Sequence, residues 1–281
     1  MNWVTVAIAF SVFSIALCGN DIDPDFLAWM NANLTPDEVA QIVRDDLVTG
    51  SFGGGVYTGN SNDRPVVLVH GLTNEAGNFW KIRQDFVAAS YPKQRIFASS
   101  WGRGNEAFNT NVKLECAYVQ AVRRFIEVVL AYTGAPQINV AGYSLGSPLA
   151  RKAILGGTCV DNSTVNFGAP LTSKIHTYLS VAGANQGSYL CLLPIVPVCS
   201  TTIGLSCGSK FLKDINTPSN YEATNNKFSI ASESDEVVGY YACLKKASMF
   251  TGAEETVVTG MSHTETEYDT ASIQLPLLRQ N

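Results

Sequence analysis

The sequence is poor in charged residues and in histidine, and these shortages exclude several classes of protein. Charged residues make up 15% of the 281 residues, and Asp and Glu outnumber Lys and Arg by 24 to 19. A chain with a net charge of −5 lacks the basic surface that binding to a nucleic-acid backbone requires. The three histidines, His70, His176 and His263, are too few for a histidine-rich metal centre. We therefore expect no nucleic-acid partner and few candidates for a catalytic histidine.

The longest apolar run is too short to cross a membrane. It extends from Val4 to Leu17, whereas a membrane-spanning helix needs about 20 residues. Its length is that of a signal-peptide core, and Ala16 and Cys18 are small enough for a signal peptidase site. We predict a cleaved signal peptide over residues 1–18, a secreted mature chain and no transmembrane segment after cleavage. An uncleaved membrane anchor is the alternative.

The cysteines agree with an extracellular location. Cleavage removes Cys18 and leaves an even number of six, which predicts three disulfides in an oxidising compartment, although 15 pairings are possible. The sequence has no Cys-x-x-Cys pair, which argues against a metal site. Three cysteines lie between residues 191 and 207 and predict a disulfide-stapled excursion around residues 187–226. Asn33 and Asn162 begin sequons for N-glycosylation.

The order of apolar patterns predicts one α/β domain over residues 19–281. Thr35-Pro36-Asp37-Glu38 has the form of a capping box and leads into a helix over Val39–Leu47, part of an N-terminal helical extension. From Arg64 onward, short apolar runs alternate with helical periods, which is typical of a mostly parallel sheet with helices on both faces. We predict strands at 66–69, 95–98, 137–141, 178–182, 227–231 and 256–258, and helices at 79–89, 114–132 and 147–155.

The strongest functional signal is the sequence Gly142-Tyr143-Ser144-Leu145-Gly146. It matches G-x-S-x-G, in which a nucleophilic serine occupies a tight turn between a strand and a helix. A second match, Gly204 to Gly208, places Ser206 in a loop that contains cysteine and proline, without the flanking strand and helix. Only Ser144 has the required context, so we predict Ser144 as the nucleophile and expect Ser206 to be an accidental match.

A nucleophilic serine needs a base to remove its proton. In enzymes with the G-x-S-x-G turn, the acid and then the histidine base follow the serine in the chain. His176 leaves room only for Asp161 as the acid, with no later strand to present it, so elimination favours His263. The acid should follow a strand end, which favours Asp235. Glu233 and Glu236 in the same loop remain alternatives.

Acyl transfer also needs donors for a negatively charged oxygen. One N–H comes from the residue after the nucleophile, here Leu145. The other comes from the loop after an earlier buried strand, here the strand that ends at His70-Gly71, and Leu72 is the expected donor. His70 and Gly71 would shape this turn. His70 lies too early in the chain to be the base.

Four segments together carry a family resemblance: Val67–Leu72, Ala141–Gly146, Ser234-Asp235 and His263. They resemble the secreted, bacterial-type class 2 triacylglycerol lipases, and the turn Gly183–Gly187 is similar to one in that family. The resemblance implies an α/β-hydrolase fold, ester hydrolysis through an acyl-enzyme and no cofactor. The implied partner is a lipid ester, met at a lipid–water interface.

Two segments are additions to a minimal core of this kind, Asp21–Gly59 and Tyr189–Cys207. The second contains the apolar stretch Leu190–Val198, which is either a lid or lipid-docking surface or a loop packed on the core. Rival functions that share the same residues are a carboxylesterase for small soluble esters and a peptidase or thioesterase. A catalytically inactive binding protein is the remaining alternative.

Overall fold

The computed structural model describes residues 20–59, 62–103, 111–192 and 196–280. The predicted signal peptide at residues 1–18 lies outside these ranges. Within them, no helix combines the length and the apolar character that crossing a membrane would require.

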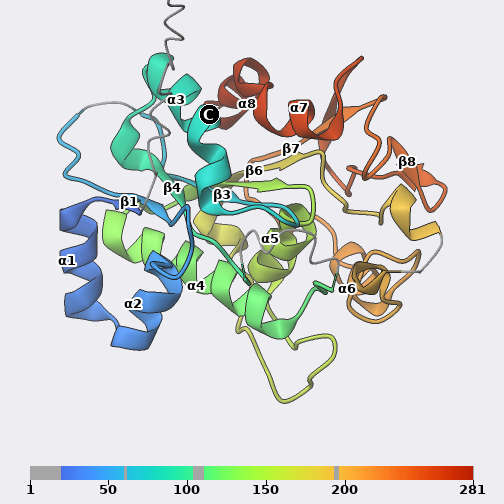
Figure 1. The fold of residues 1–281 in the computed structure, drawn as a ribbon, viewed down its shortest axis with the longest axis horizontal. Helices are drawn as coiled ribbons and strands as arrows, with labels where there is room; N and C mark the ends of the chain where they lie inside the picture. Colours follow the sequence, from blue (N-terminus) through green and yellow to red (C-terminus); the bar gives the residue numbers. More distant parts are fainter. Residues whose placement is uncertain (1–19, 60–61, 104–110, 193–195, 281) are drawn as a thin grey trace, which may run out of the picture.

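The centre of the molecule is an eight-stranded sheet with the order β1-β2-β4-β3-β5-β6-β7-β10 (Figure 1). A separate two-stranded hairpin, β8–β9, lies beside it. The strands of the main sheet are β1 (Asp21–Ile22), β2 (Phe52–Gly53), β3 (Val66–Val69), β4 (Ile96–Ala98), β5 (Ile138–Tyr143), β6 (Ile175–Val181), β7 (Asn226–Ser232) and β10 (Glu254–Val258), and those of the hairpin are β8 (Tyr241–Ala242) and β9 (Lys245–Lys246).

Within the main sheet, neighbouring strands are parallel except β2 and β4, whereas β8 and β9 of the hairpin are antiparallel. Every residue of β3, β5 and β6 is buried, as expected for parallel strands covered on both faces. Because β3, β5, β7 and β10 run in the same direction, their carboxyl ends meet at one edge of the sheet. The loops that begin at this edge contain all the residues predicted for catalysis.

Helices cover both faces of the sheet (Figure 1). On one face, α3 and α8 pack around Phe79, Phe86 and Leu275. On the other, α4 and α5 bury Val119 and Leu149 in a second, larger core. The helices are α1 (Pro24–Asn33), α2 (Pro36–Val43), α3 (Trp80–Ala88), α4 (Cys116–Thr133), α5 (Gly146–Leu155), α6 (Lys210–Asn216), α7 (His263–Tyr268) and α8 (Ala271–Leu278).

The N-terminal segment is part of the sheet rather than an appendage. It contributes β1 and β2 at one edge, and Phe26 and Met30 of α1 are completely buried. The predicted capping box is present, with Thr35 and Glu38 hydrogen-bonded to each other's backbone N–H. The predicted helix over 39–47 was wrong at both ends, since α2 begins at Pro36 and ends at Val43. Arg44 takes a left-handed conformation (φ 60°) that stops the helix.

The six predicted strands are all present, although their ends differ by up to three residues. Helices α1, α6, α7 and α8 were not predicted. α7 has only six residues, and α8 is mostly apolar with Pro276 inside it, so neither has the periodic pattern from which a surface helix is recognised.

Three disulfides join the six cysteines of the described chain, as predicted, and the structure selects one of the 15 pairings. They are Cys116–Cys159, Cys191–Cys199 and Cys207–Cys243. The second closes a short loop inside the excursion, and the third ties the excursion to the chain that follows β8. The third disulfide therefore holds the excursion against the β8–β9 hairpin.

Candidate active site

Ser144 occupies the turn between β5 and α5 with a positive φ of 49°. The Ser144 N–H donates to the carbonyl of Val181 on the neighbouring β6, at 3.0 Å, which fixes the turn. Gly146 has no room for a side chain, because a Cβ there would lie 2.3 Å from the carbonyl oxygens of Val69 and His70. A strained serine at a strand-to-helix turn is the geometry predicted from G-x-S-x-G.

His263 is the first residue of α7, and its ring lies between two of the predicted partners. Its Nε2 is 3.0 Å from Ser144 Oγ, and its Nδ1 is 2.8 Å from Asp235 Oδ2. A capping box formed by Ser262 and Glu265 fixes the start of α7 and so the position of the ring. Burial alone would lower the pKa of His263, but the hydrogen bond with Asp235 and the charge of Glu267 outweigh it and raise the pKa.

Asp235 lies in the loop after β7, where one carboxylate oxygen is hydrogen-bonded to His263 and the other to backbone N–H groups. Its Oδ1 accepts hydrogen bonds from the N–H groups of Val237 (2.9 Å) and Val238 (2.8 Å). Burial opposes ionisation, but these bonds and His263 prevail and lower the pKa of Asp235. The carboxylate therefore stays ionised and can orient the imidazole.

The two alternative acids, Glu233 and Glu236, do not contact the ring of His263 through any hydrogen bond among the described residues. Glu236 accepts a hydrogen bond from the backbone N–H of His263 at 3.0 Å, so it contacts the main chain rather than the ring. Glu233 is exposed in the same loop. The structure thus brings Asp235, of the three loop carboxylates, to Nδ1 of His263.

The rejected candidates lie elsewhere. Ser206 donates its hydroxyl hydrogen to the carbonyl of Cys199. His176 is buried in β6, where its Nδ1 is 3.0 Å from Thr177 Oγ1. Asp161 lies beside the Cys116–Cys159 disulfide. None of these contacts forms part of the hydrogen-bonded chain from Ser144 to Asp235.

The loop after β3 lies directly against Ser144. A Cβ on Gly71 would be 2.8 Å from Ser144 Cβ, so only glycine allows this approach. Leu72 follows Gly71 and is half-buried. Leu145 lies at the N-terminus of α5, where the first N–H groups of a helix lack intrahelical acceptors. Both predicted oxyanion donors therefore flank the serine.

His70 and Trp101 hold this loop in place. Burial lowers the pKa of His70 to about 4, so its ring is neutral. His70 Nε2 accepts the backbone N–H of Trp101 at 3.1 Å, which leaves Nδ1 to donate to the Gly71 carbonyl at 2.8 Å. The Trp101 indole N–H donates to the His70 carbonyl at 2.8 Å, and the two rings stack 4.8 Å apart.

One acidic residue next to the site was missed in the sequence. Glu267 on α7 is 2% exposed, and its Oε1 lies 3.9 Å from His263 Nε2. The spacing of four residues from His263 on one helix face was the only signal that could have found it.

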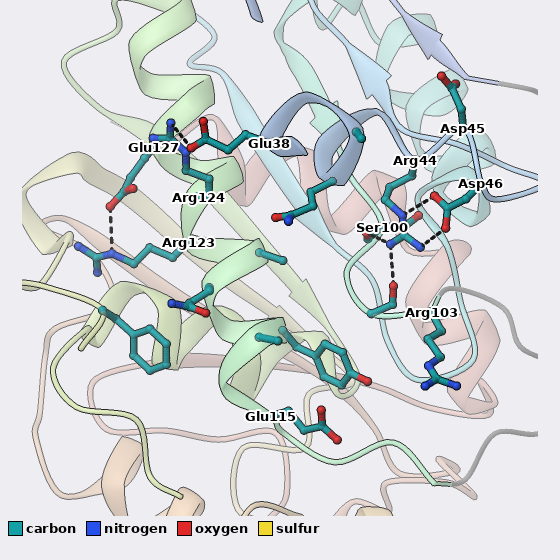
Figure 2. Close-up of a pocket in the computed structure, with 18 of the residues that line it drawn as sticks. Glu38, Arg44, Asp45, Asp46, Ser100, Arg103, Glu115, Arg123, Arg124 and Glu127 are labelled. Atoms are coloured by element: carbon teal, nitrogen blue, oxygen red, sulfur yellow. Dashed lines mark hydrogen bonds and ion pairs between the residues drawn. The ribbon is translucent and has the colours of Figure 1, made fainter. Parts of the chain in front are cut away.

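Two other polar regions lie apart from Ser144. Cys116, Cys159 and Asp161 form the one potential metal-ligand cluster in the described ranges, but both sulfurs are consumed in a disulfide. An open groove of about 1090 Å³ lies between α2 and α4 and is lined by many charged side chains (Figure 2).

Three arginines of this groove pair with neighbouring carboxylates. Arg124 of α4 pairs with Glu38 of α2 at 2.8 Å, and Arg123 pairs with Glu127 within α4 at 2.9 Å. Arg44 forms two hydrogen bonds with Asp46 and donates to the carbonyls of Ser100 and Gly102 (Figure 2). Among the described residues, those that line the groove do not include Ser144, His263 or Asp235.

The parallel sheet, the serine turn and the loop order define an α/β hydrolase. Residues 63–276 match the family model described as lipase (class 2), and the chain belongs to this family. It is a serine ester hydrolase.

Solved structures share the fold at low sequence identity. The mature lipase BlEst2 of Bacillus licheniformis superposes with a TM-score of 0.56 and 12% identity, over 81% of this chain and 97% of that one. Lipase B of Aspergillus fumigatus gives a TM-score of 0.58 and 13% identity, over 85% of this chain and 58% of that one. The family match begins at residue 63, so the segment with α1 and α2 lies outside it.

Proposed function

We propose that this protein is a secreted lipase that cleaves the carboxylic esters of lipids, triacylglycerols among them, with Ser144, His263 and Asp235 as a catalytic triad. The observation that supports this proposal is the hydrogen-bonded chain from Ser144 Oγ through the ring of His263 to Asp235, with lengths of 3.0 and 2.8 Å. A serine hydroxyl is a weak nucleophile until a base in contact with it removes the proton.

In the first half of the proposed reaction, Ser144 Oγ attacks the ester carbonyl carbon while its proton passes to His263 Nε2. Asp235 stabilises the resulting imidazolium through Nδ1. His263 then gives the proton to the oxygen of the leaving alcohol, and the acyl group stays on Ser144. In the second half, His263 takes a proton from water, the hydroxide oxygen attacks the acyl carbon, and the fatty acid leaves as the proton returns to Ser144.

The oxyanion of each tetrahedral intermediate would be bound by the N–H groups of Leu72 and Leu145. The close approach of Gly71 to Ser144 supports the first donor, and the position of Leu145 at the N-terminus of α5 supports the second. His70 and Trp101 do not contact the substrate in this mechanism. They are positioning residues that keep the Gly71-Leu72 loop close to the serine.

An exposed apolar surface beside the site supports a lipid substrate. We define the apolar rim as Tyr189, Leu190, Leu192, Tyr241 and Leu244, which are 53–102% exposed. The first three belong to the turn η4 (Tyr189–Leu192), which packs against β8, and the Tyr189 N–H donates to the carbonyl of Val238 in the loop of Asp235. Exposed apolar clusters of this kind favour contact with a lipid surface.

Secretion is supported by the cysteines and by the sequence before residue 19. Three disulfides persist only in an oxidising environment, and the apolar run at Val4–Leu17 fits a signal peptide. A single catalytic domain over residues 19–281 completes the proposal.

The decisive experiment is labelling of the mature protein with a fluorophosphonate probe, followed by peptide mapping. We expect the label on Ser144, loss of label and turnover in Ser144→Ala, and full activity in the matched control Ser206→Ala. Retained turnover in Ser144→Ala would refute the proposed nucleophile. A chain-length series of emulsified and soluble esters then separates a lipase from a carboxylesterase for small esters.

A further inference from the structure

Glu267 is a buried carboxyl that the proposed triad does not use. Its side chain is 2% exposed, and its Oε1 accepts no hydrogen bond from the residues that the structure describes. The nearest charged partner of this oxygen is His263 Nε2, at 3.9 Å, which is the nitrogen that faces Ser144. Glu267 is therefore near Nε2 of the imidazole, whereas Asp235 is bonded to Nδ1.

The surroundings of Glu267 direct its carboxyl toward the reacting groups. A Cβ on Gly71 would be 3.3 Å from Glu267 Oε1 and 2.8 Å from Ser144 Cβ, so the carboxyl borders the space between the serine and its loop. The titratable groups that act on it, or on which it acts, are His263 and Asp235 together with the phenols of Tyr143 and Tyr268. Within the described chain, His263 is the one group among them that can become positive.

Packing alone does not account for a carboxyl at this position. Burial without a hydrogen-bond donor disfavours the charged form and raises the pKa of Glu267 to about 7. Because the ordinary value is 4.5, the folded state holds the proton more tightly than the unfolded state. The resulting stabilisation is complete below pH 4.5 and is lost as the pH rises to about 7, so at pH 8 the ionised Glu267 destabilises the fold.

We propose that Glu267 is a second acidic positioning residue for His263, whose carboxylate stabilises the imidazolium that forms when Ser144 loses its proton. Asp235 acts at Nδ1 through a hydrogen bond, and Glu267 acts near Nε2 through its charge. This inference rests on the triad of the proposed function. Glu267 takes no proton in the reaction, because the proton moves from Ser144 Oγ to Nε2 and from there to the leaving oxygen.

The test is the pH profile of kcat/KM for a soluble ester in the wild type and in Glu267→Gln. Removal of the negative charge lowers the pKa of His263, so the acid limb should move to lower pH by about one unit. The plateau at high pH should fall about tenfold, because the imidazolium loses the same interaction. Glu233→Gln, which removes a carboxylate of the exposed loop, is the charge control and should change neither quantity. Glu267→Asp should restore part of both.

The stability of Glu267→Gln should change in the opposite direction to its activity. Glutamine has the same shape and no charge, so the free energy of unfolding of Glu267→Gln, relative to wild type, should increase between pH 5 and pH 8. A structural role predicts a loss of stability at both pH values and an unmoved acid limb, and that result would overturn the inference. Turnover by Ser144→Ala would instead defeat the proposed function, so the two failures are distinguishable.

Discussion

Two polar regions of this molecule differ in what their charges do. The groove between α2 and α4 contains pairs such as Arg124 with Glu38 and Arg123 with Glu127 (Figure 2). At the edge of the sheet, Ser144, His263 and Asp235 instead form a single hydrogen-bonded chain in a buried setting. The number of charges in a region is therefore a poor indicator of an active site.

The difference arises from burial and from the partners of each charge. In the groove, opposite charges on helices and loops meet near solvent, where each attraction is weak and leaves no group reactive. At the sheet edge, a strained serine, an oriented imidazole and an unpartnered carboxyl are kept away from water. Such groups are unfavourable for stability and favourable for chemistry.

Among the tests of this contrast, the substitution Asp235→Asn should have the largest effect on activity. Asparagine keeps the size of the side chain, but it no longer stabilises the imidazolium and favours the wrong tautomer of His263. We expect kcat to fall about 10⁴-fold with an unchanged circular dichroism spectrum. The matched control is Glu236→Gln, which should stay within a few-fold of wild type; the reverse ranking would assign the acid to Glu236.

The next effect concerns the apolar rim and requires two kinds of substrate. Leu190 and Leu192 are about half exposed, so each contributes about 1 kcal/mol to contact with a lipid surface. In the double variant Leu190→Asp, Leu192→Asp, the rate on emulsified triacylglycerol should fall about thirtyfold, and the rate on a soluble short ester should not change. Equal losses on both substrates would contradict a docking role.

A smaller effect is expected at the loop of Leu72, the proposed oxyanion donor. Trp101→Phe keeps the stacking on His70 and removes the indole N–H that bonds the His70 carbonyl at 2.8 Å. We expect about a tenfold loss in kcat with little change in KM, because a looser Leu72 N–H weakens the transition state more than the substrate complex. Steady-state kinetics on a soluble ester measures both constants. A change confined to KM would place Trp101 in substrate binding instead.

The smallest effect should come from the groove. Arg124→Gln breaks the pair with Glu38, whose side chains are 42% and 33% exposed. We expect kcat/KM and the unfolding temperature to stay close to wild type, since exposed ion pairs contribute little. A large loss of activity would mean that the groove and the sheet edge are coupled.

Part of the site was predictable because its signals are local. The sequence around Ser144 specifies a buried strand, a tight glycine-flanked turn and a helix within 19 residues, Gln137 to Leu155. His263 could be predicted as the base because the sequence has only three histidines. It is the one that follows both Ser144 and a loop with candidate acids in the chain. The contact of Asp235 with Nδ1 agrees with the expectation drawn from the strand before it.

The parts that escaped prediction depend on contacts between distant segments. α7 and α8 lack an amphipathic pattern, and one side of α8 is buried because α8 packs against both α3 and β6. β1 and β2 join the main sheet through the pairing of Phe52 with Ala98. A strand of two residues is too short to show a recognisable pattern in the sequence.

The sequence by itself specified six strands of the main sheet and the serine turn, and it led to the prediction of His263 as the base, because short-range patterns and residue counts carry these signals. Only the tertiary structure decided the disulfide pairing, the choice of Asp235 over its neighbours and the burial of Glu267 beside His263. Those features depend on which atoms lie within a few ångströms of one another, and this distance is set by the packing of the whole chain.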